Sequence, residues 1–315
     1  MNQSAPTVLK VLLIILFAFP STIEVSRAER QHSASEGIPC YAFLERGDLW
    51  TVCQGKRERI DLQGKVLDFA VSADGSYFAA QEKFELSDIG GARQLLVSLS
   101  RTPIEKSKLV EFPEVLYATC GTIISFDGLS LSPFDLINSQ PTRFSLYKSF
   151  RCSSDRQVIA GWTEEYDAQT QTHARNDPGL SIQRRLRVSH SGKQSEFTIW
   201  GWEVFDVSPN GKYLAYSTVA KQGREHALCV AEAEGKPACV LHSGDSVSVS
   251  DTGEILLWVG NVGVMYWRPD LKRPLLLEKA EMNSPRPQWI TPQVAHALHN
   301  WSSRRSQGAK AGIEN

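Results

Sequence analysis

The sequence predicts an all-β protein made of short strands joined by tight turns. Two apolar runs, at 204–207 and 213–216, flank the turn Ser-Pro-Asn-Gly at 208–211, which favours a hairpin. Similar hairpins return along the chain at intervals of 35 to 55 residues, without a long amphipathic helix between them. Further pairs of β-like runs follow copies of the hairpin, so one repeat unit is a four-stranded sheet.

The first 28 residues are expected to be a cleaved signal peptide. Lys10 precedes an unbroken apolar run at 11–19, which is too short to span a bilayer, and small residues stand at the cleavage positions Ser26 and Ala28. A buried amino-terminal helix is the alternative. The expected divisions are a signal peptide at 1–28, a β domain at 29–290 and a polar, disordered tail at 291–315. The mature protein is then secreted or periplasmic, without stable membrane insertion.

The cysteines fit an oxidising compartment, because all six lie after the signal peptide and their number is even. The runs flanked by Cys40 and Cys53 form a hairpin that places these two side chains opposite each other, and Cys229 and Cys239 are related in the same way. Cys120 is then left to pair with Cys152. A zinc site is the alternative, but the sequence has no Cys-x-x-Cys pair. We therefore expect three disulfides: Cys40–Cys53, Cys120–Cys152 and Cys229–Cys239.

The spacing of the repeat predicts a β-propeller. The glycine place of the turn falls at residues 75, 121, 156, 211 and 253, with intervals of 46, 35, 55 and 42 residues, about one propeller blade each. The segment at 40–62 resembles an outer strand pair only, and residues 288–290 are expected to complete its blade and close the ring. The fold class is therefore a propeller of five to six four-stranded blades. The residues expected to build the turns are Asp74, Gly75, Asn210, Gly211 and Gly253.

The segment Val-Ser-Pro-Asn-Gly-Lys-Tyr-Leu-Ala-Tyr at 207–216 resembles the repeat of TolB-like, WD40-like β-propellers. That repeat has a Ser-Pro-Asp-Gly turn followed by an apolar strand. The copy at 67–80 departs from it at Ala73, which replaces proline, and the copy at 245–258 departs further. The resemblance implies a propeller over about 40–280 but no particular activity.

Charge and motifs exclude several functions. The formal net charge is −1 and the basic residues are scattered, so nucleic acid is not an expected partner. The sequence has no Gly-x-Ser-x-Gly elbow and no Walker loop. His296 and His299 have a spacing that would suit a metal on a helix, and the acidic cluster at 164–167 would suit calcium, but both lack the usual companion ligands. We expect no metal and no cofactor.

The longest interval between repeats contains a polar insertion at 167–180, which is expected to be either a binding loop or a tolerated surface insertion. The candidate binding residues of this loop are Asp167, His173, Arg175, Asn176 and Asp177.

Three acidic residues precede the hairpin turns and are candidates for the central channel: Asp68, Asp206 and Asp245. Asp68 and Asp206 are interpreted first as structural hydrogen bonders at matching positions of the repeat. The expected function is a monomeric, non-catalytic scaffold that binds a protein or small ligand at one propeller face. The alternative is a lactonase, hydrolase or lyase that uses these carboxylates with a metal.

Overall fold

A computed structural model describes residues 38–62, 64–83, 92–99, 103–110, 115–126, 131–133, 149–162, 183–190, 192–200, 204–219, 226–232, 236–242, 244–279 and 287–311. The chain divides into two compact units, Met1–Ile38 and Pro39–Asn315, and the elements below belong to the second. No helix in the described ranges is long and apolar enough to cross a membrane.

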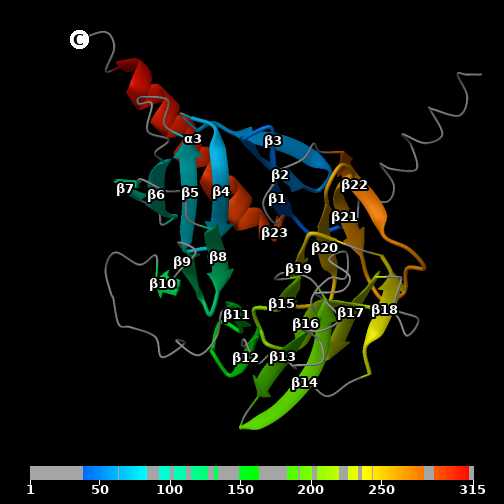
Figure 1. The fold of residues 1–315 in the computed structure, drawn as a ribbon. Helices are drawn as coiled ribbons and strands as arrows, with labels where there is room; N and C mark the ends of the chain where they lie inside the picture. Colours follow the sequence, from blue (N-terminus) through cyan, green and yellow to red (C-terminus); the bar gives the residue numbers. More distant parts are fainter. Residues whose placement is uncertain are drawn as a thin grey trace, which may run out of the picture. The chain divides into compact units, whose positions relative to one another are not determined.

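The described strands form six antiparallel sheets, which we number in chain order (Figure 1). Sheet 1 has the strand order β23-β1-β2-β3, sheet 2 contains β4–β7 and sheet 3 contains β8–β10. Sheets 4, 5 and 6 contain β11–β14, β15–β18 and β19–β22. The five four-stranded sheets are the blades of a propeller, which confirms the predicted fold class.

The elements are β1 (Tyr41–Glu45), β2 (Asp48–Cys53), β3 (Lys56–Ile60), β4 (Val66–Val71), β5 (Tyr77–Lys83), β6 (Ala92–Ser98), β7 (Ile104–Val110), β8 (Val115–Thr119), β9 (Thr122–Phe126), β10 (Leu131–Pro133), β11 (Ser149–Cys152), β12 (Val158–Trp162), β13 (Gln183–His190), β14 (Lys193–Trp200), β15 (Phe205–Val207), β16 (Tyr213–Val219), β17 (His226–Glu232), β18 (Ala238–Leu241), β19 (Ser246–Val249), β20 (Ile255–Val259), β21 (Gly263–Trp267), β22 (Leu275–Lys279), β23 (Gln288–Trp289) and α3 (Pro292–Ala311).

The hydrophobic core lies in the seams between neighbouring sheets. One cluster joins sheets 4 and 5 through side chains such as Leu186 and Leu214, and another joins sheets 5 and 6 through Val230 and Leu257. Every residue of the inner strand β15 is buried, whereas the outer strand β18 alternates between partly buried and exposed residues. The inner strand β15 is buried because both of its faces meet a neighbouring sheet, and its one polar residue, Asp206, accepts a hydrogen bond from the next sheet.

The repeat turns have the backbone geometry that the sequence predicts. All five glycine places have positive φ, including Arg156 at +61° where the other copies have glycine. In the fifth sheet the Ser208 hydroxyl accepts a hydrogen bond from the Tyr213 backbone N–H, and Asn210 Oδ1 accepts one from Lys212 N–H. Ser72 and Asp74 make the same pair of bonds in sheet 2. The serine hydroxyl and the Asx side-chain oxygen therefore accept hydrogen bonds from backbone N–H groups that the chain reversal leaves without a backbone acceptor.

The two ends of the chain share sheet 1. Tyr41 lies opposite Trp289 and Ala42 opposite Gln288, so β23 is the inner strand of this blade. The predicted pairing of residues near 288–290 is therefore confirmed, while closure of the whole ring stays a prediction. The expectation of only an outer strand pair at 40–62 is wrong, because this segment forms the three strands β1, β2 and β3.

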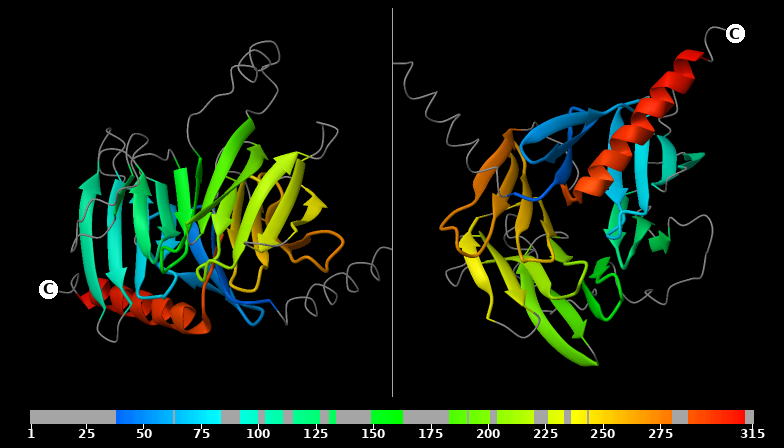
Figure 2. Two further views of the ribbon diagram at one scale, coloured as in Figure 1. Left: turned by 90° about the horizontal axis from the view of Figure 1, so that it is seen from below. Right: turned by 180° about the vertical axis from the view of Figure 1, so that it is seen from behind.

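The prediction of a disordered tail at 291–315 is wrong for 292–311, because Pro292–Ala311 form the helix α3, and 312–315 lie outside the described residues. Figure 2 shows α3 lying along one end of the strands, on the side of the β4–β5 turn. Val294, Leu298 and Trp301 recur at helical spacing and belong to the buried cluster between sheets 1 and 2. The average composition of this segment is polar, and a narrow apolar stripe was sufficient to fold it against the sheets.

Polar contacts also hold α3 in place. Ser302 Oγ accepts a hydrogen bond from the Asp61 backbone N–H at 2.7 Å. The Arg305 guanidinium, with only 9% of the side chain exposed, pairs with the buried Glu82 carboxylate at 3.0 Å. The helix is therefore an integral part of the β domain, which does not end at residue 290.

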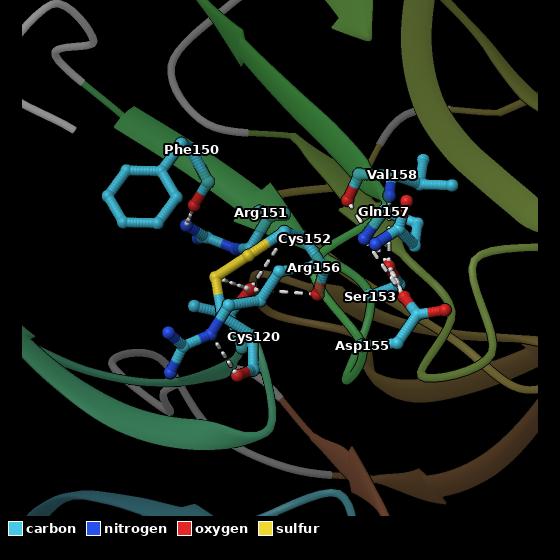
Figure 3. Close-up of a disulfide and its surroundings, with 10 residues drawn as sticks. Cys120, Phe150, Arg151, Cys152, Ser153, Asp155, Arg156, Gln157 and Val158 are labelled. Atoms are coloured by element: carbon cyan, nitrogen blue, oxygen red, sulfur yellow. Dashed lines mark hydrogen bonds between the residues drawn. A yellow bond between two sulfur atoms is a disulfide. The ribbon is translucent and has the colours of Figure 1, made fainter. Parts of the chain in front are cut away.

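The structure forms the same three disulfides that the cysteine positions predict. Cys229–Cys239 joins the neighbouring strands β17 and β18, and Cys40–Cys53 joins the residue before β1 to the end of β2, whereas Cys120–Cys152 joins sheet 3 to sheet 4. Figure 3 shows this last bond beside the turn that contains Arg156. Thr119 Oγ1 accepts a hydrogen bond from the Cys152 backbone N–H at 2.8 Å, so covalent and polar contacts coincide at this seam.

The repeat turns allow a paired test in two copies of one motif. Arg156→Gly should leave stability unchanged or raise it by up to about 1 kcal/mol, since relief of the left-handed backbone is partly offset by unfolded-state entropy. Gly211→Ala should lower stability by about 1–3 kcal/mol, because a Cβ there would lie 2.8 Å from Val158 Cγ2. Urea denaturation measures both. Equal destabilisation by the two substitutions would contradict the interpretation that residues 156 and 211 both occupy the glycine place of the repeat turn.

A second prediction concerns α3. Trp301→Ala should lower the free energy of unfolding by about 3–5 kcal/mol, because the indole packs 5.6 Å from the Phe78 ring within the core. Ser303→Ala, at an exposed position of the same helix, is the matched control and should change stability by less than about 0.5 kcal/mol. A Trp301→Ala protein as stable as the control would show that α3 is dispensable.

Candidate binding groove between sheets 4 and 5

In sheets 2 to 6 the repeat turns join the first strand to the second, so they lie together at one end of the strands. We call this end the repeat-turn face. Neighbouring turns are bonded directly: Ser154 N–H donates to Pro209 O at 2.7 Å, and Asn210 N–H donates to Asp251 Oδ1 at 2.7 Å. These bonds link sheets 4, 5 and 6, so side chains placed on this face have a firm support.

A groove opens at this end between sheets 4 and 5, with a volume of about 70 Å³, and we call it the β14–β16 groove. Its floor is formed by Val158 and Val188 from sheet 4 and by Leu214 and Ala231 from sheet 5. All four side chains are buried members of the core cluster between these sheets. The floor is therefore apolar and has the size of a small aliphatic side chain.

The rim of the β14–β16 groove is polar and charged. Lys212 Nζ lies 3.7 Å from Glu232 Oε1 and 5.0 Å from the centre of the Tyr213 ring. The Tyr213 hydroxyl donates to the same Glu232 oxygen at 3.4 Å. The pKa of Lys212 is raised, mainly by its hydrogen bond with Tyr213 and secondly by the charge of Glu232. This ammonium therefore stays protonated at neutral pH. His190, Lys193 and Ser195 complete the rim on the side of sheet 4.

An apolar floor with a charged and hydrogen-bonding rim is the composition of a protein-binding hot spot. The Tyr213 ring packs against Gly253 of sheet 6, and this contact restricts the position of the side chain.

The acidic residues predicted for the channel have structural contacts. Asp68 Oδ2 accepts a hydrogen bond from Leu116 N–H of sheet 3 at 2.7 Å, and Asp206 Oδ2 accepts one from Val249 N–H of sheet 6 at 3.0 Å. Both carboxylates therefore join one inner strand to the next. Their interpretation as matching positions is wrong: Asp68 precedes its turn serine by four residues and Asp206 by two. Asp245 is exposed and accepts from the Gly260 backbone N–H in its own sheet.

The turn residue Asp74 is ionised at neutral pH. Partial burial alone would favour its protonated form, but hydrogen bonds from Ser76 and Ser72 hold the pKa of this carboxyl below its usual value. The candidate loop residues Asp167, His173, Arg175, Asn176 and Asp177 lie outside the described residues, as does the acidic cluster at 164–167.

The two tail histidines lie on α3 and have different surroundings. His299 Nε2 lies 3.0 Å from Thr51 Oγ1 and 3.1 Å from Glu58 Oε2, whereas His296 is exposed. Burial lowers the pKa of His299, and the negative charge of Glu58 offsets part of this effect. Within the described ranges, no three His, Cys, Asp or Glu side chains are grouped so that they could hold a metal.

Sequence reasoning missed one ionic cluster between sheets 1 and 6. Arg57 Nη1 donates to Glu278 Oε2 at 2.9 Å, Arg57 also pairs with Glu45, and its guanidinium lies 4.1 Å from the Trp50 ring centre. The Tyr41 hydroxyl donates to Glu278 Oε1 at 3.5 Å. Burial raises the pKa of Tyr41 and of Glu278. The cluster connects the amino-terminal strands to β22, and its members are too far apart in sequence to be recognised together.

Sequence reasoning also missed the β14–β16 groove. The available signal was limited to Lys212 and Tyr213, which follow the repeat glycine directly and so had to lie on the repeat-turn face. The contribution of His190, Lys193 and Glu232 depends on how two sheets pack, which the pattern of one repeat does not specify.

The sequence matches no family model, and a search of curated proteins finds no match. Solved structures with a similar arrangement include TolB from Acinetobacter baumannii, with 15% identity, a TM-score of 0.47, and coverage of 85% of this chain and 71% of TolB. The chain is a β-propeller that resembles TolB-like and WD40-like propellers.

Two further propellers are similar to this one. The β-propeller domain of the Trilobed protease from Pyrococcus furiosus, described as having an open velcro topology, has 11% identity and a TM-score of 0.40, with coverage of 76% of this chain and 81% of that domain. The propeller domain of Cps50 (Swd1) from Myceliophteria thermophila has 12% identity and a TM-score of 0.36, with coverage of 72% and 79%.

The structural interpretation of Asp206 can be tested directly. Asp206→Ala should lower the free energy of unfolding by about 1–3 kcal/mol, because it leaves the buried Val249 N–H without its acceptor. Asp206→Asn keeps an acceptor oxygen and should cost less. Asp245→Ala is the exposed acidic control and should cost less than about 0.5 kcal/mol. If Asp206→Ala is as stable as this control, the carboxylate has no structural role and the channel interpretation returns.

Proposed function

We propose that the protein is an exported, non-catalytic scaffold that binds a protein partner on the repeat-turn face, with the β14–β16 groove as the anchoring site. The groove carries this proposal, because it combines an apolar floor at the seam between two blades with a charged rim. A small apolar side chain of a partner would fit against this floor while its polar neighbours meet the rim.

Export is supported by the three disulfides and by the order of charge, apolar run and cleavage site at the amino terminus. The compartment is proposed to be the periplasm or the exterior of the cell. The non-catalytic role is supported by the contacts of Asp68 and Asp206, whose carboxylates accept backbone hydrogen bonds between sheets. We propose that the protein acts as a monomer and requires no cofactor.

Site-specific photocrosslinking tests the groove as a binding site. Benzoylphenylalanine replaces Ser195 on the rim in one variant and the exposed Ser107 of β7 in the control. The proteins are exported in their native host, irradiated and analysed by mass spectrometry. We expect a discrete protein adduct at 195 that is absent at 107. Adding Lys212→Glu to the 195 variant should reduce this adduct about tenfold, because it reverses the charge of the rim.

The proposal has clear contrary results. Equal adducts at positions 195 and 107 would show that the contact is not specific to the groove. No adduct at 195 would exclude the groove as a protein-binding site in that host.

A further inference from the structure

A second groove runs along the outer side of α3 and is independent of the β14–β16 groove. It is bounded by Leu99 at the end of sheet 2, and its volume is about 540 Å³. Ligand-binding clefts have volumes of about 300–1,000 Å³, so this space is large enough for several side chains or a peptide segment. The helix residues that line it are His296, Ala297, Asn300, Ser303, Arg304 and Gln307.

These lining residues form a stripe that the docking of α3 does not use. The opposite stripe holds the helix: Leu298 and Trp301 are buried in the core, and Arg305 pairs with Glu82. On the outer stripe, the Arg304 Nε–H donates to Asn300 O within the helix at 3.1 Å. Replacing an outer side chain should therefore leave the position of α3 unchanged.

Among the described lining residues of this groove, Arg304 carries the fixed charge. The helix segment 292–311 contains Arg304, Arg305 and Lys310 and has no aspartate or glutamate. Arg305 forms an ion pair with Glu82, and its Nη2 atom lies 3.5 Å from Glu105 Oε1. Arg304 is exposed and lines the groove, and the lining residues that lie in the described ranges include no carboxylate. The amides of Asn300 and Gln307 supply further donors.

We propose that this groove binds an extended acidic segment of a partner protein. An arginine recognises a carboxylate by charge-assisted hydrogen bonds, and the neighbouring amides suit the peptide backbone. From His296 to Gln307 the helix rises about 16 Å, which matches about five residues of extended chain. The described lining residues follow one face of the helix from 296 to 307, and this elongated lining favours a segment of chain over a small enclosed anion.

Binding is measured by fluorescence anisotropy with a fluorescein-labelled decapeptide of alternating glutamate and alanine. The matched probes are the same peptide with lysine for glutamate and a labelled ten-nucleotide oligothymidine. We expect saturable binding of the acidic peptide, weaker at higher salt, and no saturable binding of the lysine peptide. Tighter binding of oligothymidine than of the acidic peptide would overturn the proposal in favour of nucleic acid.

Arg304→Glu should weaken binding of the acidic peptide about tenfold or more. Lys272→Glu, with the same charge change at an exposed position between β21 and β22, is the control and should leave affinity within about twofold. Arg304→Gln serves as the second variant if Arg304→Glu fails to fold, and it should also weaken binding. Equal effects at 304 and 272, or no binding by the unaltered protein, would overturn the proposal. Because the β14–β16 groove is tested separately by crosslinking at 195, failure here leaves that site unaffected.

Discussion

A sheet whose inner strand is buried on both faces is stable only between two neighbours, and this constraint governs the whole β domain. Sheets 4, 5 and 6 satisfy it through continuous clusters in their seams. Sheet 1 has a particular difficulty, since its inner strand and its second strand come from opposite ends of the chain. No repeat turn joins them, so other contacts must fix the position of β23.

The helix α3 provides those contacts. It follows β23 directly and places Val294 against Gly75, the turn glycine of sheet 2. In sheet 5 the corresponding glycine, Gly211, packs against side chains from the preceding sheet 4. The first turn of α3 thus occupies the place that a repeat turn of sheet 1 would have occupied. This explains why a segment of polar average composition is folded.

Polar groups inside the domain serve the same purpose. Gln288 of β23 accepts a hydrogen bond from Val71 N–H and donates one to Phe69 O, both at 2.9 Å, and so bonds the composite blade to sheet 2. Asp68 and Asp206 make comparable bonds at two other seams. The two proposed binding surfaces lie elsewhere, at the cavities of the β14–β16 groove and of the outer stripe of α3.

Sequence reasoning predicted most of the strands, the repeat turns, the three disulfides and the pairing of residues near 288 with the first blade. The turns and two of the disulfides follow from local chemistry: glycine at positive φ, serine and Asx side chains that bond their own turn, and cysteines placed opposite each other in hairpins. The Cys120–Cys152 bond followed by elimination, and the pairing near residue 288 followed from the need to complete a blade. The fold of 292–311, the contacts of Asp68 and Asp206, and the positions of both grooves depend on tertiary packing. The stripe on α3 is narrow, and its stability comes from Phe78 and Glu82, which are more than 200 residues away in sequence. The grooves are spaces between elements, so their shape depends on how sheets and helix pack, which no single repeat contains.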